Sequence, residues 1–383
     1  MNATLASAAP LGAPLRVVLA PDSFKGTVSA RDAARALGEG WRSVRPDDEV
    51  LLFPMADGGE GTLDAFETAV AGSVRMPVTV QGPDNRPVSA SWLLLPGSAE
   101  NPGGTAVIEL ANTSGITLLD PLLPLDAHTF GFGQAIAAAL DHGVHRLLLA
   151  IGGSASSDGG VGALAALGAQ FLDAAGRPIR LGNRGLGQLA RVRLDGMRAV
   201  PAGGAQILSD VGNPLLGPSG AAAVFGPQKG ASPAQVEGIE SGLRRLARLL
   251  PGGVDTPGAG AAGGTGFGLL HWGALLTPGA AAIGDAMGLA DAVAAAAVVI
   301  TGEGRFDSQS AAGKVPAYVA GLAAASGASA MLAAGAIAAP SDDFAAAVSL
   351  SELADSPAAA MAEPERWLSA AGARLAGSVT GAR

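Results

Sequence analysis

The stretch Gly152-Gly153-Ser154-Ala155-Ser156-Ser157-Asp158-Gly159-Gly160 decides how the fold of this chain is interpreted. The apolar run Arg146–Ile151 precedes it, and the small-residue run Val161–Leu167 follows it. A buried strand, a loop of glycine and serine, and a helix in this order place N–H groups and hydroxyls at the positive end of a helix. The stretch therefore predicts an anion-binding loop. The alternative is a tight turn between a strand and a helix.

Composition limits the class of protein. A chain of 383 residues suits two domains and can bury a large core. Hydrophobic residues make up 49% of the chain but aromatic residues only 4%, which predicts a core of Ala, Val, Leu and Ile. The net charge of −9 argues against nucleic acid or an anionic membrane as a partner, because both favour a basic surface.

Several kinds of chemistry and location are also excluded or disfavoured. The absence of cysteine excludes disulfides and thiol catalysis, and the four histidines lack the spacing of zinc ligands. The first residues show neither a basic segment nor a continuous apolar segment of a secretory signal. Apolar runs such as 292–300 are too short to span a bilayer. We therefore expect a soluble, cytoplasmic protein.

Lysine is rare in this chain. Only Lys25, Lys229 and Lys314 occur among the 24 basic residues, and all three lie in glycine-rich stretches. A compact ammonium group acts as a point charge on a phosphate or carboxylate where the planar guanidinium of arginine does not fit. The three lysines are therefore candidates for anion binding, the alternative being chance survival on the surface.

The first part of the chain alternates between strand, loop and helix. Leu15–Ala20 is an expected strand, and Ser29 with Asp32 forms a capping box that opens a helix to about Val44. A second strand, 50–53, is followed by another glycine-rich loop and a helix to about residue 70. This alternation predicts a doubly wound parallel sheet, with ligands bound beyond the carboxyl ends of the strands.

The pattern changes near Met76, where alternating strands at 77–80 and 88–95 flank a turn and predict an antiparallel hairpin. A further strand is expected at 105–110, and the helix 129–141 with the strand 146–151 returns to the first pattern. We therefore predict a Rossmann-like domain with a second α/β domain inserted. The predicted Rossmann-like segments are 1–75, 126–160 and 285–383, and the predicted inserted segments are 76–125 and 161–284.

The last third contains two stretches that look like nucleotide motifs. Residues 258–263 match G-x-G-x-x-G, but no strand precedes them, so we reject a dinucleotide fingerprint and expect a hinge or a substrate-side loop. Gly313-Lys314 is not a Walker A motif, because Val315 stands where Ser or Thr is required. Strands are expected at 297–300 and 330–334, with a loop over 301–310 and a surface helix from about Glu363.

The loops favour phosphoryl transfer over acyl transfer. No G-x-S-x-G elbow occurs and histidine is scarce, whereas N–H cradles, a few cations and several carboxylates are all present. Asp158 illustrates the case, because a carboxylate within a phosphate cradle repels its ligand unless a metal ion lies between them. The alternative for Asp158 is to cap the following helix.

Six motifs together resemble the bacterial glycerate kinase family, type 1, the glycerate 2-kinases, from about Arg16 to the C-terminus. The resemblance implies transfer of the γ-phosphate of ATP to D-glycerate, with Mg²⁺, giving 2-phosphoglycerate in a cleft between two α/β domains. A kinase for another small hydroxy acid, a non-catalytic regulator that binds a nucleotide or sugar acid, and a phosphatase remain open, as does the oligomeric state. The motifs are Pro21-Asp-Ser-Phe-Lys-Gly26, Ala56-Asp-Gly-Gly-Glu-Gly-Thr62, Ile151-Gly-Gly-Ser-Ala-Ser-Ser-Asp-Gly-Gly160, Asp210-Val-Gly-Asn-Pro-Leu-Leu-Gly217, Phe225-Gly-Pro-Gln-Lys-Gly230 and Thr301-Gly-Glu-Gly-Arg-Phe-Asp-Ser-Gln-Ser310.

Residue types and loop positions suggest the roles for substrate. Lys25, with Ser23, is expected to bind the glycerate carboxylate or the transferring phosphate, and Asn213 to bind substrate. Asp57 or Asp210 is expected to orient or deprotonate the acceptor hydroxyl, with a turn-forming role as the alternative. The sequence does not choose between the two aspartates.

The remaining candidates are expected to bind nucleotide and metal. Mg²⁺ is assigned to Asp158, Glu303 and Asp307, although Arg305 is placed to pair with the last two. The loop after the strand 146–151 and the two other lysines are assigned to the nucleotide phosphates. These phosphate-binding residues are Gly152, Gly153, Ser154, Ser156, Ser157, Gly159, Lys229 and Lys314.

Overall fold

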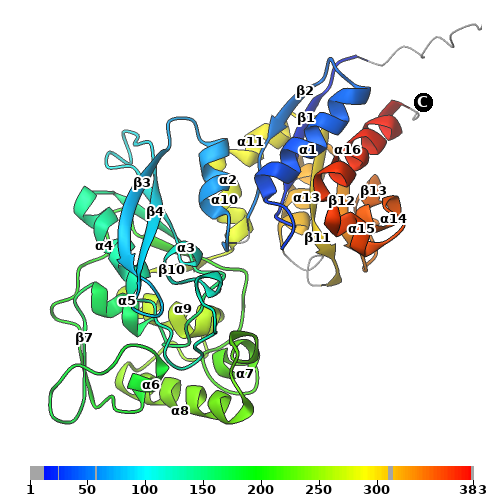
Figure 1. Ribbon diagram of the computed structural model, residues 1–383. Helices are drawn as coiled ribbons and strands as arrows, with labels where there is room; N and C mark the ends of the chain where they lie inside the picture. Colours follow the sequence, from blue (N-terminus) through cyan, green and yellow to red (C-terminus); the bar gives the residue numbers. More distant parts are fainter. Residues whose placement is uncertain (1–12, 25, 57, 309–313, 381–383) are drawn as a thin grey trace, which may run out of the picture. The chain divides into compact units, whose positions relative to one another are not determined.

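The structure, a computed structural model, describes residues 13–24, 26–56, 58–308 and 314–380 (Figure 1). The chain divides into two compact units. The first unit comprises Met1–Met55 and Gly284–Arg383, and the second comprises Ala56–Ile283. The second unit is therefore one continuous insertion, and its last boundary falls within helix α10, Gly279–Met287.

The first unit is built on a five-stranded sheet in which every neighbouring pair is parallel. Numbered along the chain, its order is 2-1-3-4-5, which is a doubly wound arrangement. The order reverses between β1 and β11, so the loops after these two strands flank the switch point where such sheets bind ligands. In spatial order the strands are β13 (Ala346–Ser349), β12 (Ser329–Ile337), β11 (Val298–Phe306), β1 (Arg16–Pro21) and β2 (Glu49–Leu52).

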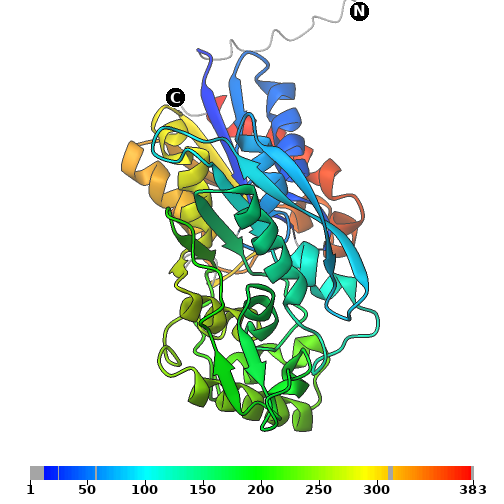
Figure 2. The same cartoon turned by 90° about the vertical axis from the view of Figure 1, so that its left-hand side faces the viewer.

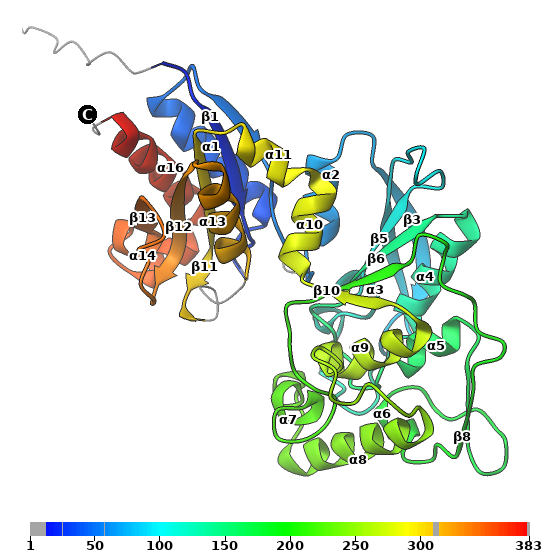
Figure 3. The same ribbon diagram turned by 180° about the vertical axis from the view of Figure 1, so that it is seen from behind.

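Helices cover both faces of this sheet. Helices α1 (Ala30–Val44) and α16 (Pro364–Thr380) lie on one face, and α13 (Val315–Ser326) lies on the other (Figures 1 and 3). The core between the sheet and the first pair includes the buried Trp41 and Leu368. The C-terminal helix begins close to the predicted start, and it packs one face on the sheet while the other face is exposed. The shorter helices are α11 (Leu289–Ala294), α14 (Leu350–Leu353) and α15 (Pro357–Ala362).

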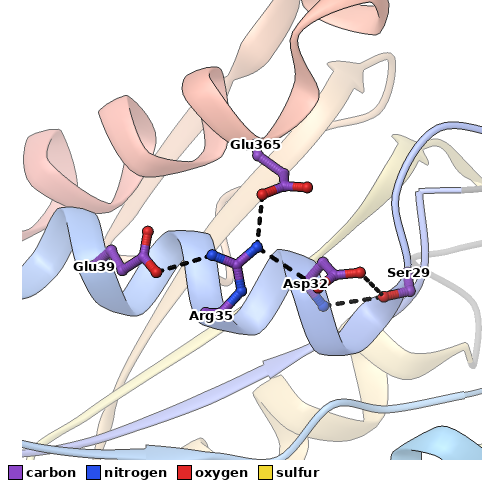
Figure 4. A network of polar contacts seen from close by, with 5 residues as sticks. All are labelled: Ser29, Asp32, Arg35, Glu39 and Glu365. Carbon is purple, nitrogen blue, oxygen red and sulfur yellow. Dashed lines mark hydrogen bonds and ion pairs between the residues drawn. The ribbon is translucent and has the colours of Figure 1, made fainter.

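Helix α1 shows how local sequence sets an element's start. The Ser29 hydroxyl accepts a hydrogen bond from the Asp32 N–H at 3.0 Å, as the capping box predicted. On the exposed side, Arg35 bridges Glu39 of the same helix and Glu365 of α16, at 2.9 and 2.6 Å (Figure 4). These exposed ion pairs align the two helices and add little stability.

The second unit contains a six-stranded mixed sheet. Its strands β10, β9, β6 and β5 run parallel, and β4 and β3 form the predicted antiparallel hairpin at one edge (Figure 2). A separate antiparallel pair consists of β7 (Gln170–Leu172) and β8 (Arg191–Arg193). In spatial order the strands of the large sheet are β10 (Leu275–Thr277), β9 (Ala205–Leu208), β6 (Arg146–Ala150), β5 (Thr105–Glu109), β4 (Pro87–Leu95) and β3 (Val74–Gln81).

One apolar core joins this sheet to its helices. Ile108, Leu149 and Ile207 from neighbouring strands pack with Phe132 and Phe267 from two helices, all fully buried or nearly so. None of the helices within the described residues has the length and hydropathy of a membrane span. The helices are α2 (Thr62–Ala69), α3 (Ala111–Ser114), α4 (Phe130–His142), α5 (Val161–Ala166), α6 (Asn183–Leu186), α7 (Ala221–Phe225), α8 (Pro233–Leu249) and α9 (Ala261–Trp272), with short 3-10 helices at Ile116–Leu118 and Pro227–Lys229.

The predicted domain boundaries were wrong for two segments. Residues 56–75 and 126–160 belong to the second unit, because β6 pairs with β5 and β9 and not with the five-stranded sheet. Both sheets are parallel and both use strand–loop–helix units. The local pattern around residues 146–160 therefore fits either sheet, and only long-range pairing decides between them.

The end of β11 also differs from the prediction. The strand was expected to stop at Ile300, yet its pairing with β12 continues through Arg305↔Ala336 and Phe306↔Ile337. The glycine-rich run suggested a loop, but β12 is equally rich in small residues, so the two backbones stay paired. Glu303 therefore lies within a strand.

Candidate active site

In the second unit, the candidate loops meet at the carboxyl edge of the parallel strands. The Gly152 N–H donates to the Gly58 carbonyl at 2.9 Å, and a Cβ on Gly152 would lie 2.5 Å from the Cα of Gly59. This close approach requires glycine and holds the loop after β2 against the loop after β6. Asp57 itself lies outside the described residues.

Asp158 organises the 152–160 loop from inside. It is fully buried, and its Oδ2 accepts from the Thr129 N–H at 3.0 Å, the Thr129 hydroxyl at 2.9 Å and the Gly162 N–H at 3.1 Å. Its Oδ1 accepts from the Gly160 N–H at 3.0 Å. A carboxylate with four donors and no exposure has no room for Mg²⁺. The structure therefore favours the alternative role of capping α5 over the predicted metal ligand.

Only one end of the loop reaches solvent. Gly153 is exposed, Gly152 is half-buried and Ser154 is 7% exposed, whereas Ser156, Ser157 and Gly159 are buried. The hydroxyls of Ser156 and Ser157 have no hydrogen-bond partner among the described residues. Of the predicted phosphate-binding residues in this loop, the structure therefore presents Gly152, Gly153 and the edge of Ser154.

Lys229 lies beneath the loop and not on the surface. Its residue exposure is 3%, and its Nζ donates to the Ser154 hydroxyl at 2.9 Å and to the Ser156 carbonyl. Burial lowers the pKa of Lys229 to about 7, although the negative charge of Asp158 acts in the opposite direction. The alternative that Lys229 is a chance lysine on the surface is therefore wrong. Because its ammonium group is buried, Lys229 cannot contact a nucleotide directly in this arrangement.

The glycine-rich segment 257–266 packs against the same loop. The Gly263 carbonyl accepts from the Gly159 N–H at 3.1 Å, and a Cβ on Gly263 would lie 2.1 Å from the Ser156 carbonyl oxygen. Gly263 also has a φ of 67°, which side chains rarely adopt. The rejection of a dinucleotide fingerprint is confirmed, since a turn and not a strand precedes α9. The segment forms a packed kink, and its role as a hinge or a substrate-side loop stays a prediction.

Asp210 is an exposed carboxylate at the same sheet edge. It follows β9, and its Oδ1 accepts from the Gly279 N–H at 2.8 Å, at the start of α10. This bond orients the carboxylate while leaving the residue in contact with solvent. Asn213 turns its side-chain amide toward its own loop, donating to the Ser219 carbonyl at 2.7 Å.

Glu109, at the end of β5, is a site residue that was not predicted from the sequence. Its Oε2 accepts from the Leu63 N–H at 3.3 Å, and a backbone hydrogen bond from Gly61 also reaches its carboxylate. Burial raises the pKa of Glu109 to about 7, and the nearby Asp64 and Glu60 act in the same direction. Glu109 thus anchors the start of α2, directly after the loop that contains Asp57. The only sequence signal was a carboxylate at the end of an apolar strand.

In the first unit, the candidates lie after β1 and in or just after β11. The Asp22 N–H donates to the Gly302 carbonyl at 2.8 Å, and the Ser23 N–H donates to the Asp22 carboxylate at 2.6 Å. Ser23 is half-buried, and Lys25 lies outside the described residues. The structure adds Asp22, which is 5% exposed, to the groups at the switch point.

Glu303 and Asp307 stand four residues apart along an extended chain. Extended backbone separates such positions by roughly 13 Å, so the two carboxylates are not neighbouring ligands of one ion. Mg²⁺ is often held by one or two carboxylates together with substrate phosphates, and oxygen donors of this kind fit it. The Nε of Arg305 lies 3.9 Å from the Oδ2 of Asp307. Lys314 is the residue directly before α13.

Comparison with known proteins gives one consistent answer. The family model described as "Glycerate kinase family" matches residues 17–380. A glycerate 2-kinase of Escherichia coli (strain K12) is 39% identical over 318 residues, which cover 81% of this chain and 82% of the relative. A glycerate kinase of Bacillus subtilis (strain 168) is 42% identical over 318 residues, covering 80% and 81%.

A solved structure agrees with these relatives. It is a crystal structure of a protein from Salmonella typhimurium LT2 that is described as a proposed glycerate kinase 2. The two chains are 38% identical and superpose with a TM-score of 0.82, covering 96% of this chain and 99% of the other. The α/β architecture described above is therefore shared over nearly the whole length. This chain belongs to the glycerate kinase family.

Proposed function

We propose that this protein transfers the γ-phosphate of ATP to the 2-hydroxyl of D-glycerate, giving 2-phosphoglycerate and ADP with the help of Mg²⁺. The observation that carries the proposal is the family match over residues 17–380, with curated relatives at about 40% identity named glycerate kinase or glycerate 2-kinase. The sheet edges support it, because their loops offer carboxylates and N–H groups and lack the nucleophile elbow of acyl transfer.

Asp210 is the described residue best suited to act on the acceptor hydroxyl. It is exposed at the carboxyl edge of the second sheet, and its bond with the Gly279 N–H fixes the direction of the carboxylate. In phosphoryl transfer such an aspartate orients the hydroxyl and accepts its proton as the new O–P bond forms and the bond to ADP breaks. Asp57 remains the other candidate.

Glu303 or Asp307 would hold Mg²⁺ in this proposal, directly or through water. Asp307 is the more accessible of the two, with a side-chain exposure of 36%. When bound, the ion neutralises charge on the phosphate oxygens. Lys25 and Ser23, at the neighbouring switch-point loop, would bind an anionic group of the substrate.

The test is release of ADP from ATP, measured with and without D-glycerate and with and without Mg²⁺. We expect turnover that requires both additions, with L-glycerate as the stereochemical control. Phosphate release without glycerate would favour a phosphatase. Turnover with another hydroxy acid in place of glycerate would favour a related kinase, and binding without turnover would favour a regulator.

Asp57→Asn and Asp210→Asn separate the two candidates for the base. The true base should lose at least about 100-fold in kcat with nucleotide affinity retained, because general-base catalysis contributes on this scale. If neither substitution lowers kcat, both assignments fall.

A further inference from the structure

Lys229 fixes the direction of one hydroxyl in the 152–160 loop. An ammonium group donates hydrogen bonds and cannot accept them. The Ser154 oxygen, 2.9 Å from Nζ, therefore accepts, and its own hydrogen is left to donate elsewhere. The second bond of Lys229, to the Ser156 carbonyl, ties the ammonium to the buried part of the loop.

The chain builds a space for this ammonium. Helix α9 opens with three left-handed residues, Ala262, Gly263 and Gly264, at φ of 53°, 67° and 86°. A Cβ on Gly263 would lie 2.9 Å from the Lys229 Nζ. A non-glycine residue in this region is strained and persists only where its surroundings require it. The strained start of α9 therefore leaves room for the lysine and the loop together.

Among the described residues, the charge that acts on Lys229 is that of Asp158. From the loop, Asp158 faces it, and that carboxylate already accepts four hydrogen bonds. Asp158 also interacts electrostatically with His128, whose pKa is lowered by burial and whose Nδ1 accepts from the Phe130 N–H. From α9, the contacting residue is the uncharged Gly263. With the pKa of Lys229 at about 7, its charge changes over the range of ordinary assays.

The exposed part of the loop lies next to the residue that Lys229 contacts. Ser154 is 7% exposed, and the neighbouring Gly153 is exposed. We propose that Lys229 is a positioning residue: from inside the protein it holds the Ser154 hydroxyl as a donor toward an oxyanion at Gly152–Ser154. The proposal rests on the proposed function for the oxyanion, a nucleotide phosphate or the glycerate carboxylate.

Binding measurements test this without relying on turnover. ADP and D-glycerate are each titrated calorimetrically at pH 6 and pH 9 into the wild type, Lys229→Met, Ser154→Ala and the double variant. We expect one ligand to bind the wild type about tenfold more tightly at pH 6, where Lys229 is charged, than at pH 9. Both single variants should bind that ligand about tenfold more weakly at pH 6, with most of the pH dependence lost.

The double variant should bind no more weakly than either single variant, because both changes break the same link. The ligand's own titration is the same for every variant, so differences between variants report on the protein. Ser43→Ala is the matched control, since its hydroxyl bonds the Gly40 carbonyl within α1 of the other unit.

Wild-type affinity and pH dependence in Lys229→Met for both ligands would overturn the proposal and leave a packing role. If Lys229→Met does not fold, the titrations of Ser154→Ala decide the question. Unchanged binding of both ligands by Ser154→Ala would also overturn the proposal. The ligand that is affected identifies the oxyanion. A kinase assay without glycerate-dependent turnover, alongside the expected binding pattern, would refute the proposed function and leave this inference standing.

Discussion

The loop 152–160 of the second unit and the segment after β11 of the first unit occupy the same position in their sheets but differ in construction. Both follow a central parallel strand. In the first, Asp158 is fully buried and accepts four hydrogen bonds. At the second position, the side chain of Arg305, near the end of β11, is 69% exposed, and that of Asp307, just after the strand, is 36% exposed. One segment is a locked part of the core, and the other presents charge to solvent.

The difference shows that glycine-rich loops at a sheet edge serve two purposes. In the second unit, glycine lets backbones touch, as Gly152 meets Gly59 and Gly263 meets Ser156. In the first unit, the charged residues after the strand are accessible. Position on the sheet therefore indicates where a ligand can bind, and burial indicates which residues can reach it. The comparison predicts large losses of stability in the second unit and small ones in the first.

Gly263→Ala should have the largest effect. The new Cβ would lie 2.1 Å from the Ser156 carbonyl oxygen at a left-handed backbone position, so we expect a loss of about 4 kcal/mol or more, or no folded protein. Urea unfolding measures it. The control is Gly238→Ala within α8, where no atom lies within 4 Å of the new Cβ, and a gain of about 0.5 kcal/mol is expected. Equal stability of the two variants would contradict the locked loop.

Asp158→Asn should come next. The amide nitrogen cannot accept the hydrogen bonds that now reach the carboxylate from Thr129, Gly160 and Gly162, so we expect a loss of about 3 kcal/mol. Asp141→Asn, at an exposed ion pair with Arg198, should cost less than about 0.5 kcal/mol. A stable Asp158→Asn variant that has lost only Mg²⁺-dependent activity would restore the metal-ligand role.

Glu109→Gln should change the pH dependence of stability. The folded pKa of Glu109 is raised from 4.5 to about 7, so its contribution is fully present below pH 4.5 and is lost as pH rises through about 7. The loss corresponds to roughly 3–4 kcal/mol. The stability of the wild type relative to Glu109→Gln should therefore fall between pH 4.5 and pH 7. A difference that is constant over this range would show that Glu109 ionises normally.

Asp307→Asn should have the smallest effect on stability. The side chain is 36% exposed just beyond the end of β11, so we expect a change within about 0.5 kcal/mol. If it holds Mg²⁺, the concentration of Mg²⁺ needed for half-maximal ADP release should nevertheless rise. A large loss of stability would show that the first unit is locked in the same way as the second.

Sequence alone predicted the elements better than their assembly. Capping by Ser29, the β3–β4 hairpin and the α/β class follow from local chemistry, and all are observed. The membership of β6 in the second sheet could not be predicted, because parallel strands in either sheet carry the same apolar pattern.

The sequence predicted where the candidate site lies in the fold, but not which of its residues are exposed. The family resemblance and the loop at residue 152 were recognised from motifs, and the family is confirmed. The burial of Asp158 and Lys229 depends on Thr129 and on the kink at Gly263, which lie far away in sequence. No spacing rule connects these residues, so their partnership required the structure.

The most direct test of the central claim is the phosphorus NMR spectrum of the product formed from ATP, Mg²⁺ and D-glycerate. Phosphorylation at O2 places the phosphate beside a carbon that bears a single hydrogen, so we predict a doublet for the phosphate ester. A triplet, from the two hydrogens at C3, would identify 3-phosphoglycerate and contradict the assignment of the 2-hydroxyl as acceptor. A spectrum with no new ester signal would contradict the kinase itself.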